Sequence, residues 1–329
     1  MSDSFEHRPV MLDEIVATFR AVPPGVVLDA TLGGGGHSEA ILDSREDLRV
    51  LGLDRDPAAL AAASVRLDRF GERLMTYRCR FDAIDDAMAA HAIDTLSGAL
   101  FDLGVSSPQL DHPARGFSYR NQGPLDMRMD TDAPWSADDV VNGYSEAELG
   151  RVLKELGDER FAARIARAIV AARPIESTTR LAEVVTSAIP AAARRTGGHP
   201  SKRTFQAIRI EVNGELDALP EALDRAIDAL APEGRIAVLS YHSGEDRIVK
   251  DRLRHAATGG CECPPELPCV CGAVQTVRLV RAPKRPTEAE QASNRLATSA
   301  RLRVAERTMN PHDETTSHDE TTSHDRAAG

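Results

Sequence analysis

The chain has 329 residues and a mass of 35.5 kDa, of which 42% are hydrophobic and 28% charged, so it has enough length for one large or two average domains and is not a disulfide-stapled mini-protein. No apolar run is long enough to span a bilayer, and the N-terminal residues lack the pattern of a secretory signal, so we expect a soluble, cytoplasmic protein. The net charge of −11 argues against a nucleic-acid partner unless basic residues are clustered.

The first third of the chain alternates strand and helix signals. Apolar, partly β-branched runs at 26–30, 49–53 and 96–103 predict strands, and 57–70 and 81–91 between them predict helices. Asp56 is a suitable N-cap because it directly precedes Pro57. This alternation is typical of a parallel sheet covered by helices on both faces.

Strand signals stop at about residue 111 and resume at 235–241, 274–280 and 302–307. Amphipathic patterns at 146–155 and 159–172 predict helices in the intervening region. We therefore expect an α/β fold with an inserted all-helical domain. The expected division is 1–110 and 204–310 for the two parts of the α/β domain, 111–203 for the insertion, and 311–329 for a disordered acidic tail with a repeated His-Asp-Glu-Thr-Thr-Ser unit.

Two basic regions contrast with the acidic average. Residues 160–203 contain nine arginines and lysines and two glutamates, and residues 247–285 contain eight basic and three acidic residues. Solvated helix faces would explain such a pattern, and so would binding to the phosphates of a nucleic acid. The candidates for RNA contacts within the insertion are Arg160, Arg164, Arg167, Arg194, Arg195, Lys202 and Arg203.

A glycine run follows the first predicted strand. Gly33 to Gly36 let the backbone turn sharply before a helix and let a ligand approach closely. Asp54 ends the second strand about 20 residues later, where a carboxylate accepts hydrogen bonds from a ribose. Because Asp29 directly precedes the loop, the site is hostile to a pyrophosphate, and an acid near the loop suits the amine of S-adenosylmethionine. The sequence therefore favours S-adenosylmethionine over a dinucleotide.

These residues form part of a larger set of motifs that closely resembles the ribosomal RNA small subunit methyltransferase H family, also called MraW. The resemblance extends from about residue 7 to 307 and rests on seven ordered blocks: Asp29-x-Thr-x-Gly-x-Gly-Gly-His-Ser38, Leu53-Asp-Arg-Asp-Pro57, Asp102-Leu-Gly-Val-Ser-Ser-Pro-Gln109, Arg115-Gly-Phe-Ser118, Gly123-Pro-Leu-Asp-Met-Arg-Met129, Arg203-Thr-Phe-Gln-Ala207, and Ser240-Tyr-His-Ser243 continuing through Glu245 to Val249.

The resemblance implies a class I, Rossmann-like S-adenosylmethionine methyltransferase that modifies N4 of a decoding-centre cytidine in the 16S ribosomal RNA of the small subunit. No membrane partner is implied, and a homodimer is kept as an open alternative. The residues that the resemblance assigns to the cofactor are Gly35, Gly36, His37, Asp54, Phe81, Asp102 and Gln109.

The catalytic candidates are Ser107 and Asp102. A cytosine amine is a poor nucleophile until an acceptor draws on its N–H, and the polar-Pro turn that contains Ser107 resembles the corresponding motif of amino-directed methyltransferases. Ser107 or nearby carbonyls would accept from N4, and Asp102 would orient the cofactor. Phe117, Tyr119 and Tyr241 could stack on an extruded base or simply pack in the core.

Four of the five cysteines lie close together, at Cys261, Cys263, Cys269 and Cys271. Four thiolates suit a structural zinc ion, although the Cys-x-Cys spacing is tighter than usual. Redox-active thiols and a mobile loop without a ligand are the alternatives. Cys79 lies apart from this cluster and is expected to be buried and inert.

Three other functions share some of these features. A dehydrogenase would use the same strand, loop and acid, but the G-x-G-x-x-G helix start is missing. A non-catalytic ribosome-binding protein could retain the fold, and failure to bind S-adenosylmethionine would favour it. A methyltransferase that acts on DNA or protein would use the same amine-directed chemistry.

Overall fold

The computed structural model describes residues 8–195, 198–264, 270–294 and 296–309, with the side chains of Ser107 and Arg195 also outside the description. The predicted acidic tail at 311–329 and Cys269 lie outside these residues. Among the described helices, none combines the length and the apolar character needed to cross a membrane.

A seven-stranded sheet forms the centre of the α/β part, with the strand order β3-β2-β1-β4-β5-β7-β6. Neighbouring strands from β3 to β5 are parallel, whereas β7 runs antiparallel to β5 and β6. This arrangement confirms the predicted Rossmann-like fold class. The strands are β1 (Gly25–Asp29), β2 (Leu48–Asp54), β3 (Leu74–Arg78), β4 (Leu96–Asp102), β5 (Leu230–Ser240), β6 (Val277–Val280) and β7 (Arg301–Arg307).

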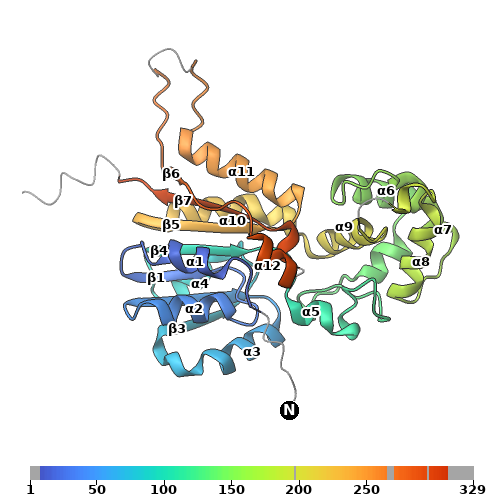
Figure 1. Ribbon diagram of the computed structural model, residues 1–329, viewed down its shortest axis with the longest axis horizontal. Helices are drawn as coiled ribbons and strands as arrows, with labels where there is room; N and C mark the ends of the chain where they lie inside the picture. The colour runs from blue at the N-terminus through green and yellow to red at the C-terminus, as the bar shows by residue number, and fades with distance from the viewer. Residues whose placement is uncertain (1–7, 196–197, 265–269, 295, 310–329) are drawn as a thin grey trace, which may run out of the picture.

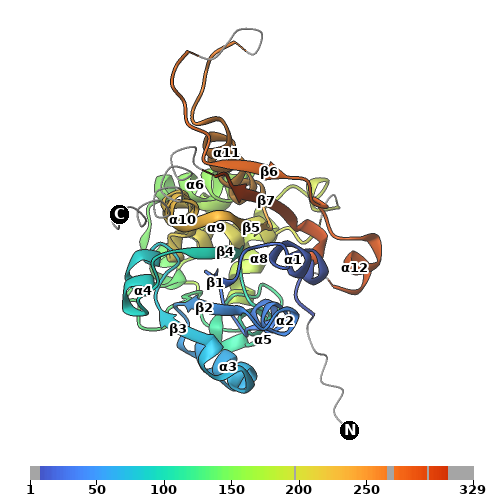
Figure 2. The ribbon, with the colours of Figure 1, turned by 90° about the vertical axis from the view of Figure 1, so that its left-hand side faces the viewer.

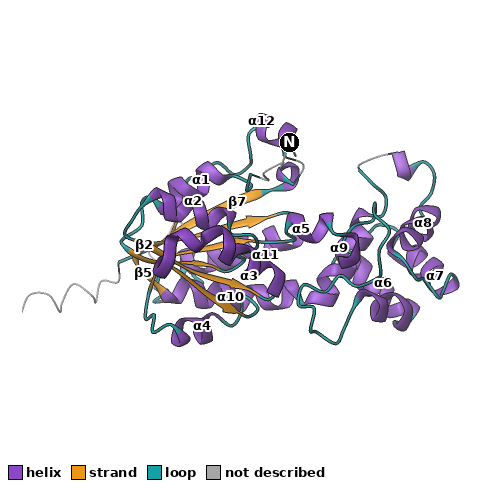
Figure 3. Cartoon of the chain, turned by 90° about the horizontal axis from the view of Figure 1, so that it is seen from below, coloured by secondary structure: helices purple, strands orange, loops and turns teal. Residues whose placement is uncertain are grey.

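Helices cover both faces of the sheet, as Figure 3 shows. Because successive strand residues point to opposite faces, Val26 and Leu28 of β1 join one core and Val27 joins the other. The first core is completed by α4 (Ile84–Ala90), α10 (Glu215–Ala229) and α11 (Ser243–Thr258), and the second by α1 (Leu12–Phe19) and α2 (Gly36–Ser44). Burial on both faces explains why these strands are continuous apolar runs.

Local signals placed the helices around β2 and β3 well, except at their ends. Asp56 caps α3 (Pro57–Leu67) as predicted, because its carboxylate accepts from the N–H of Ala58. The predicted helix at 57–70 ends three residues early and continues as a 3-10 segment, Asp68–Arg73, in which Gly71 adopts φ 53°. The helix predicted at 81–91 is the shorter α4.

The insertion forms a helical body beside the carboxyl ends of the strands, at the right in Figure 1. Its own apolar core includes Leu149, Ile165, Val185 and Phe205. The predicted boundary at 203/204 falls inside its last helix, α9, whose residues from Phe205 to Ile208 pack in that core. The helices of this region are α5 (Ser107–Asp111), α6 (Glu146–Glu155), α7 (Ala162–Ala171), α8 (Thr178–Ala188) and α9 (Lys202–Asn213), with short turns at Pro113–Arg115, Asp139–Gly143 and Ala193–Arg195.

The C-terminal part of the described chain returns to the sheet. The short helix α12 (Glu288–Ser293) and the 3-10 turn Ala297–Ser299 precede β7. Glu290 of α12 accepts a hydrogen bond from the backbone N–H of Met11, and Asn294 donates to the carbonyl of Arg8. These contacts hold the N-terminal segment against the sheet part.

Candidate active site

The glycine loop connects β1 to α2 at the carboxyl edge of the sheet. Gly35 is the N-cap of α2 with φ 77°, and a Cβ there would lie 2.9 Å from Leu67, so only glycine fits. Gly36 begins the helix, and His37 follows as a buried residue with 6% exposure. The loop residues therefore lie where the sequence predicted them, although the His37 ring points inward.

The His37 ring faces a hydrogen-bond acceptor on each side. Its Nε2 donates to the carbonyl of Val10 at 2.9 Å, and its Nδ1 lies 3.4 Å from Asp102 Oδ2. Burial alone would lower the pKa of His37, but the hydrogen bond and charge of Asp102 outweigh it and raise the pKa above the ordinary value. Two acceptors favour the doubly protonated ring, and through them His37 links the N-terminal segment to the end of β4.

Asp29 has a different role from the one expected from its position. Its carboxylate is 1% exposed and accepts from the Ser38 hydroxyl at 2.6 Å and from the Thr31 N–H at 3.2 Å. Burial raises the pKa of Asp29 to about 6. The interpretation of Asp29 as the acid that meets the cofactor's amine is wrong for this structure, because its oxygens are enclosed by the loop that they hold together.

Asp54 ends β2 beside the same loop. One oxygen accepts from the Gly33 N–H at 2.9 Å and the other from the Asp56 N–H at 2.8 Å. Burial raises the pKa of Asp54, while these two N–H groups act in the opposite direction. The carboxylate thus has a fixed orientation, and each oxygen retains a lone pair for a further donor.

Asp102 ends β4, and three elements converge on it. Its Oδ1 accepts from the Tyr241 hydroxyl at 2.6 Å, Oδ2 faces His37, and its backbone N–H donates to the Thr31 hydroxyl at 2.7 Å. The side chain nevertheless remains 27% exposed. Asp102 is therefore, like Asp54, a partly exposed acid beside the glycine loop.

The polar-Pro turn continues directly from β4 into α5. Gln109 accepts from the Ser106 N–H at 3.1 Å and donates to Asp56 Oδ2 at 3.1 Å, and it is 6% exposed. Ser107 is the first residue of α5, and its side chain is outside the description. The structure thus uses Gln109 to connect α5 with the start of α3, and a cofactor contact by Gln109 remains a prediction.

Phe81 lies just after β3, on the other side of the loop. Its ring makes an edge contact with Phe101 of β4, with 6.2 Å between centroids, and it is partly buried against the core of that face. A partly buried ring just after a strand can pack in the core or stack on a base, so the structure is compatible with both the core and the adenine interpretation of Phe81.

Sequence reasoning assigned no role to the residues that join the helical body to the sheet. Arg115 donates to Asp56 Oδ2 at 2.7 Å and to the carbonyls of Arg128 and Met129. Asn213 at the end of α9 accepts from the Met129 N–H and donates to the carbonyl of Met127. Arg115 and Asp56 both belong to recognised motifs, so both residues were visible in the sequence, but their pairing was not.

Glu245 was missed in the same way. It is 2% exposed and accepts from the backbone N–H groups of Tyr241 and His242, while its own N–H donates to His242 Nδ1. The three-residue spacing from His242 to Glu245 is that of a capping box, which is the signal that could have identified it. Next to it, the Ser243 hydroxyl donates to Asp158 of the helical body at 2.5 Å.

Comparison with known proteins identifies the family of the chain. The model of the MraW methylase family matches residues 4–308. The chain belongs to this family. Family membership confirms the resemblance predicted from the seven motifs. The matched residues include nearly all of the described chain.

Relatives of similar length share about half of their residues with the chain. A ribosomal RNA small subunit methyltransferase H from Heliobacterium mobile is 48% identical over 92% of this chain and 99% of its own length. A protein of the same name from Mycobacterium sp. (strain KMS) is 50% identical over 92% of this chain and 84% of its own. The solved structure of an rRNA methylase from Streptococcus thermophilus aligns with 93% of this chain at a TM-score of 0.40 and 13% identity, too distant to inform the site.

In this family member, two of the aromatic rings considered for base stacking are engaged inside the protein. Phe117 is 6% exposed in the helical core. Tyr119 stacks on His199 with 4.4 Å between centroids and makes an edge contact with Phe205. Tyr241 donates to Asp102, as described above. The core-packing interpretation is therefore correct for Phe117, whereas Tyr119 packs against the same core and remains partly exposed.

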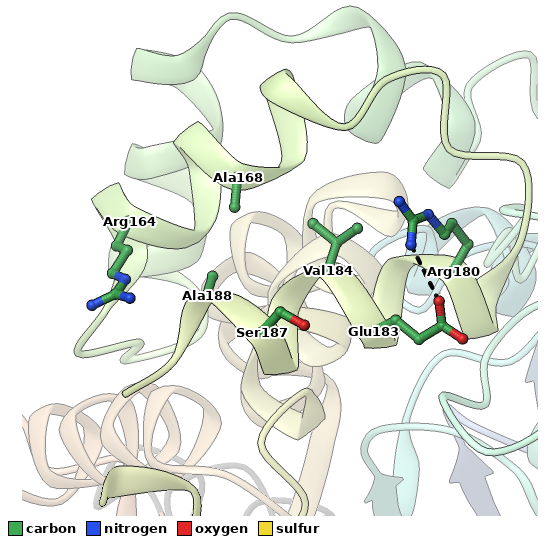
Figure 4. Close-up of a pocket in the computed structure, with 7 residues that line it drawn as sticks. All are labelled: Arg164, Ala168, Arg180, Glu183, Val184, Ser187 and Ala188. Atoms are coloured by element: carbon green, nitrogen blue, oxygen red, sulfur yellow. Dashed lines mark hydrogen bonds and ion pairs between the residues drawn. The ribbon is translucent and has the colours of Figure 1, made fainter. Parts of the chain in front are cut away.

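The basic residues of the helical body have different surroundings. Arg203 donates to the carbonyl of Asp158 and so lies at the junction with Ser243. Arg164 lines a shallow groove of about 400 Å³ between α7 and α8, with Arg180 at its other end (Figure 4). The remaining candidates are Arg160 against the Phe161 ring, Arg167 at 3.4 Å from Glu146, Arg194 bound to the carbonyls of Ile189 and Ser187, exposed Lys202, and Arg195, whose side chain is not described.

Proposed function

We propose that the chain transfers a methyl group from S-adenosylmethionine to the exocyclic N4 of a decoding-centre cytidine in 16S ribosomal RNA. The observation that carries this proposal is the convergence of the glycine loop, Asp54 and Asp102 at one edge of the sheet, next to the turn at Ser106. Family membership and the names of the relatives support the polymer and the subunit.

The groups at this edge match the chemistry of the cofactor. Asp54, fixed by two backbone N–H groups, would accept from the ribose hydroxyls, and Phe81 would stack on the adenine. Asp102 would hold the ammonium group, because it is the partly exposed carboxylate beside the loop that is left when Asp54 binds the ribose. A Cβ at Gly34 would have no atom within 4 Å, so the loop presents open space on that side. S-adenosylmethionine supplies an electrophilic methyl group on a sulfonium sulfur.

The protein's part in the transfer is to position the amine and to accept a hydrogen bond from its N–H. The lone pair of a cytosine amine is delocalised into the ring, so an acceptor at its N–H makes it a better nucleophile. The turn after β4 would supply backbone carbonyls and Ser107 for that purpose, five residues after Asp102 in the sequence. Orientation of this kind can lower a barrier by roughly 7–11 kcal/mol in favourable cases.

The helical body would bind the RNA through phosphates. Arg203 and Arg160 lie near the junction with the sheet part, and Arg164 and Arg167 lie on α7. Such contacts orient a nucleic acid without reading its sequence. The target base must leave its stack before it can reach the site, at a cost of a few kcal/mol.

The test is transfer of labelled methyl from S-adenosylmethionine to small ribosomal subunits that lack the modification. Naked 16S RNA, duplex DNA and bulk protein serve as parallel acceptors, and nucleoside analysis identifies the product. The wild type is expected to form N4-methylcytidine on the subunit, and Asp102→Asn is expected to lose this activity while remaining folded.

Other outcomes separate the alternatives. Transfer to DNA or protein alone would support S-adenosylmethionine as the cofactor and contradict ribosomal RNA as the substrate. Cofactor binding without any transfer, combined with binding to the subunit, would identify a non-catalytic ribosome-binding protein. Failure to bind S-adenosylmethionine would reject the methyltransferase proposal.

A further inference from the structure

The segment between α11 and β6 extends away from the body of the protein, at the top of Figure 2. It leaves α11 at Gly259, where φ is 60°, and returns at Thr276, whose N–H donates to the carbonyl of Ala256 at 2.9 Å. A Cβ at Gly259 would lie 2.5 Å from the carbonyl oxygen of Val274, so the outgoing and returning arms touch at the base and only glycine fits there.

Beyond this base, the described part of the segment has no core of its own. None of residues 259–264 and 270–276 is buried, and Val270 and Val274 are 89% and 61% exposed. Two backbone hydrogen bonds, from Gly260 to His255 and from Cys261 to Thr258, support only the start of the outgoing arm. A protruding segment without an apolar core usually depends on a metal ion or a covalent cross-link.

Thiols from both arms meet in this segment. Cys261 and Cys263 lie on the outgoing arm and Cys271 on the returning arm, and their sulfur atoms all lie within 4.8 Å of one another. Tetrahedral zinc with bonds of about 2.3 Å to sulfur places its ligand sulfurs about 3.8 Å apart. The three sulfurs therefore already surround the position of such an ion. Each sulfur–sulfur distance would have to shorten by at most about 1 Å for all three atoms to bond to zinc.

We propose that Cys261, Cys263 and Cys271 provide three of the four ligands of a single zinc ion that holds the two arms of this segment together. Thiolates are soft ligands and select zinc over magnesium or calcium. The ion is structural rather than catalytic, because the 16 residues of α11 separate the cluster from His242 by about 24 Å along the helix. The proposal is independent of the methyl transfer reaction.

Cys79 provides a matched control. It is the one cysteine outside the 261–271 cluster, it lies just after β3, and burial raises the pKa of its thiol to about 12. Such a thiol is a poor ligand because metal binding requires the thiolate. Cys79→Ser therefore removes one thiol without affecting the proposed site.

The experiment measures zinc bound to the full chain purified without chelators, by plasma mass spectrometry. The wild type and Cys79→Ser are expected to contain one equivalent, and Cys261→Ser and Cys271→Ser less than about 0.2 equivalents. When the zinc is replaced by Co²⁺, the absorption spectrum of the wild type is expected to show thiolate-to-metal charge-transfer bands and the intense visible bands of a tetrahedral ion. These bands should be lost in the two cluster variants and retained in Cys79→Ser.

Limited proteolysis gives a second readout. Removal of zinc by a chelator is expected to expose the segment to cleavage between α11 and β6 in the wild type, and Cys271→Ser should be cleaved there without chelator. Retained affinity for S-adenosylmethionine in Cys271→Ser would show that the variant is folded. Wild-type protein with less than about 0.2 equivalents of zinc, unchanged zinc in the cluster variants, or intact-mass evidence that these thiols are disulfides would each overturn the proposal.

Discussion

The phenolic hydroxyl of Tyr241 donates to Asp102 Oδ1 at 2.6 Å, across the carboxyl ends of the neighbouring strands β4 and β5. Burial, together with the nearby charge of Asp102, raises the pKa of Tyr241 well above its ordinary value, so the hydroxyl remains a donor at any physiological pH. Asp102 is also 3.4 Å from His37 Nδ1. The carboxylate proposed to meet the cofactor is therefore oriented by two side chains that are distant in the sequence.

Tyr241→Phe should weaken the binding of S-adenosylmethionine about tenfold, because a hydrogen bond to a charged group is worth about 1.5–3 kcal/mol and Asp102 would lose its orientation. Titration calorimetry measures the affinity. Tyr144→Phe is the matched control, since it removes a hydroxyl that donates to Glu211 at 2.8 Å in the helical body. Equal losses in both variants would contradict a local role for Tyr241.

Asp54→Ala should weaken S-adenosylmethionine binding by roughly 2–4 kcal/mol, because the ribose would lose a charged acceptor and Gly33 would lose the partner of its N–H. Asp43→Ala, on the outer side of α2 in an exposed pair with Arg69, should leave the affinity unchanged. Unchanged calorimetric affinity for Asp54→Ala would mean that the ribose binds elsewhere.

The unfolding free energy of Asp29→Asn should increase relative to that of the wild type as the pH rises. The pKa of Asp29 is raised from 3.8 to about 6, so its stabilising contribution is complete below about 3.8 and is lost as the pH rises through about 6. An asparagine cannot ionise, so the advantage of the variant should grow by about 2 kcal/mol between pH 4 and pH 7.

Urea unfolding at these two pH values measures the effect. Asp47→Asn is the control, because its hydrogen bond with Arg45 lowers the pKa of Asp47 and gives the opposite sign. A free-energy difference between Asp29→Asn and the wild type that does not change with pH would show that Asp29 is ionised throughout this range.

Arg115→Ala should destabilise the protein by about 3 kcal/mol, because it would leave the Asp56 carboxylate, which is 2% exposed, without its cation. Burial raises the pKa of Asp56, but its hydrogen bonds with Arg115 and Gln109 outweigh burial and lower it. Denaturant unfolding measures the change. Arg69→Ala breaks an exposed ion pair and should change the unfolding free energy by less than about 1 kcal/mol.

Replacement of Arg164 and Arg167 by glutamate should raise the Kd for ribosomal RNA by at least about tenfold and reduce its salt dependence, since both side chains are exposed on α7. The control is the same reversal at Arg20 and Arg49, two exposed arginines at the opposite end of the sheet. An equal loss in the control would indicate a general charge effect, and a parallel loss of cofactor affinity would indicate misfolding.

Features that depend on neighbouring residues could be predicted from the amino-acid sequence alone. The strands β1, β2 and β4 were visible as apolar runs, the start of α3 as Asp56 before Pro57, and the cofactor loop as consecutive glycines followed by Asp54. Each is local because strand burial, helix capping and tight turns act over a few residues. The family motifs extended this prediction to the order of the elements and to the helical insertion.

The pairs of side chains that meet in the site could not be predicted in this way, because they depend on how the chain folds. Asp29 lies next to the loop in the sequence, yet it is enclosed by Ser38 and Thr31, whereas Asp102 is brought to the loop by the pairing of β1 with β4. The sulfurs of Cys261 and Cys271 approach each other because the two arms of their segment close at Gly259. Such contacts depend on the strand order and on the path of the chain between strands, and hydrophobic periodicity carries no information about either.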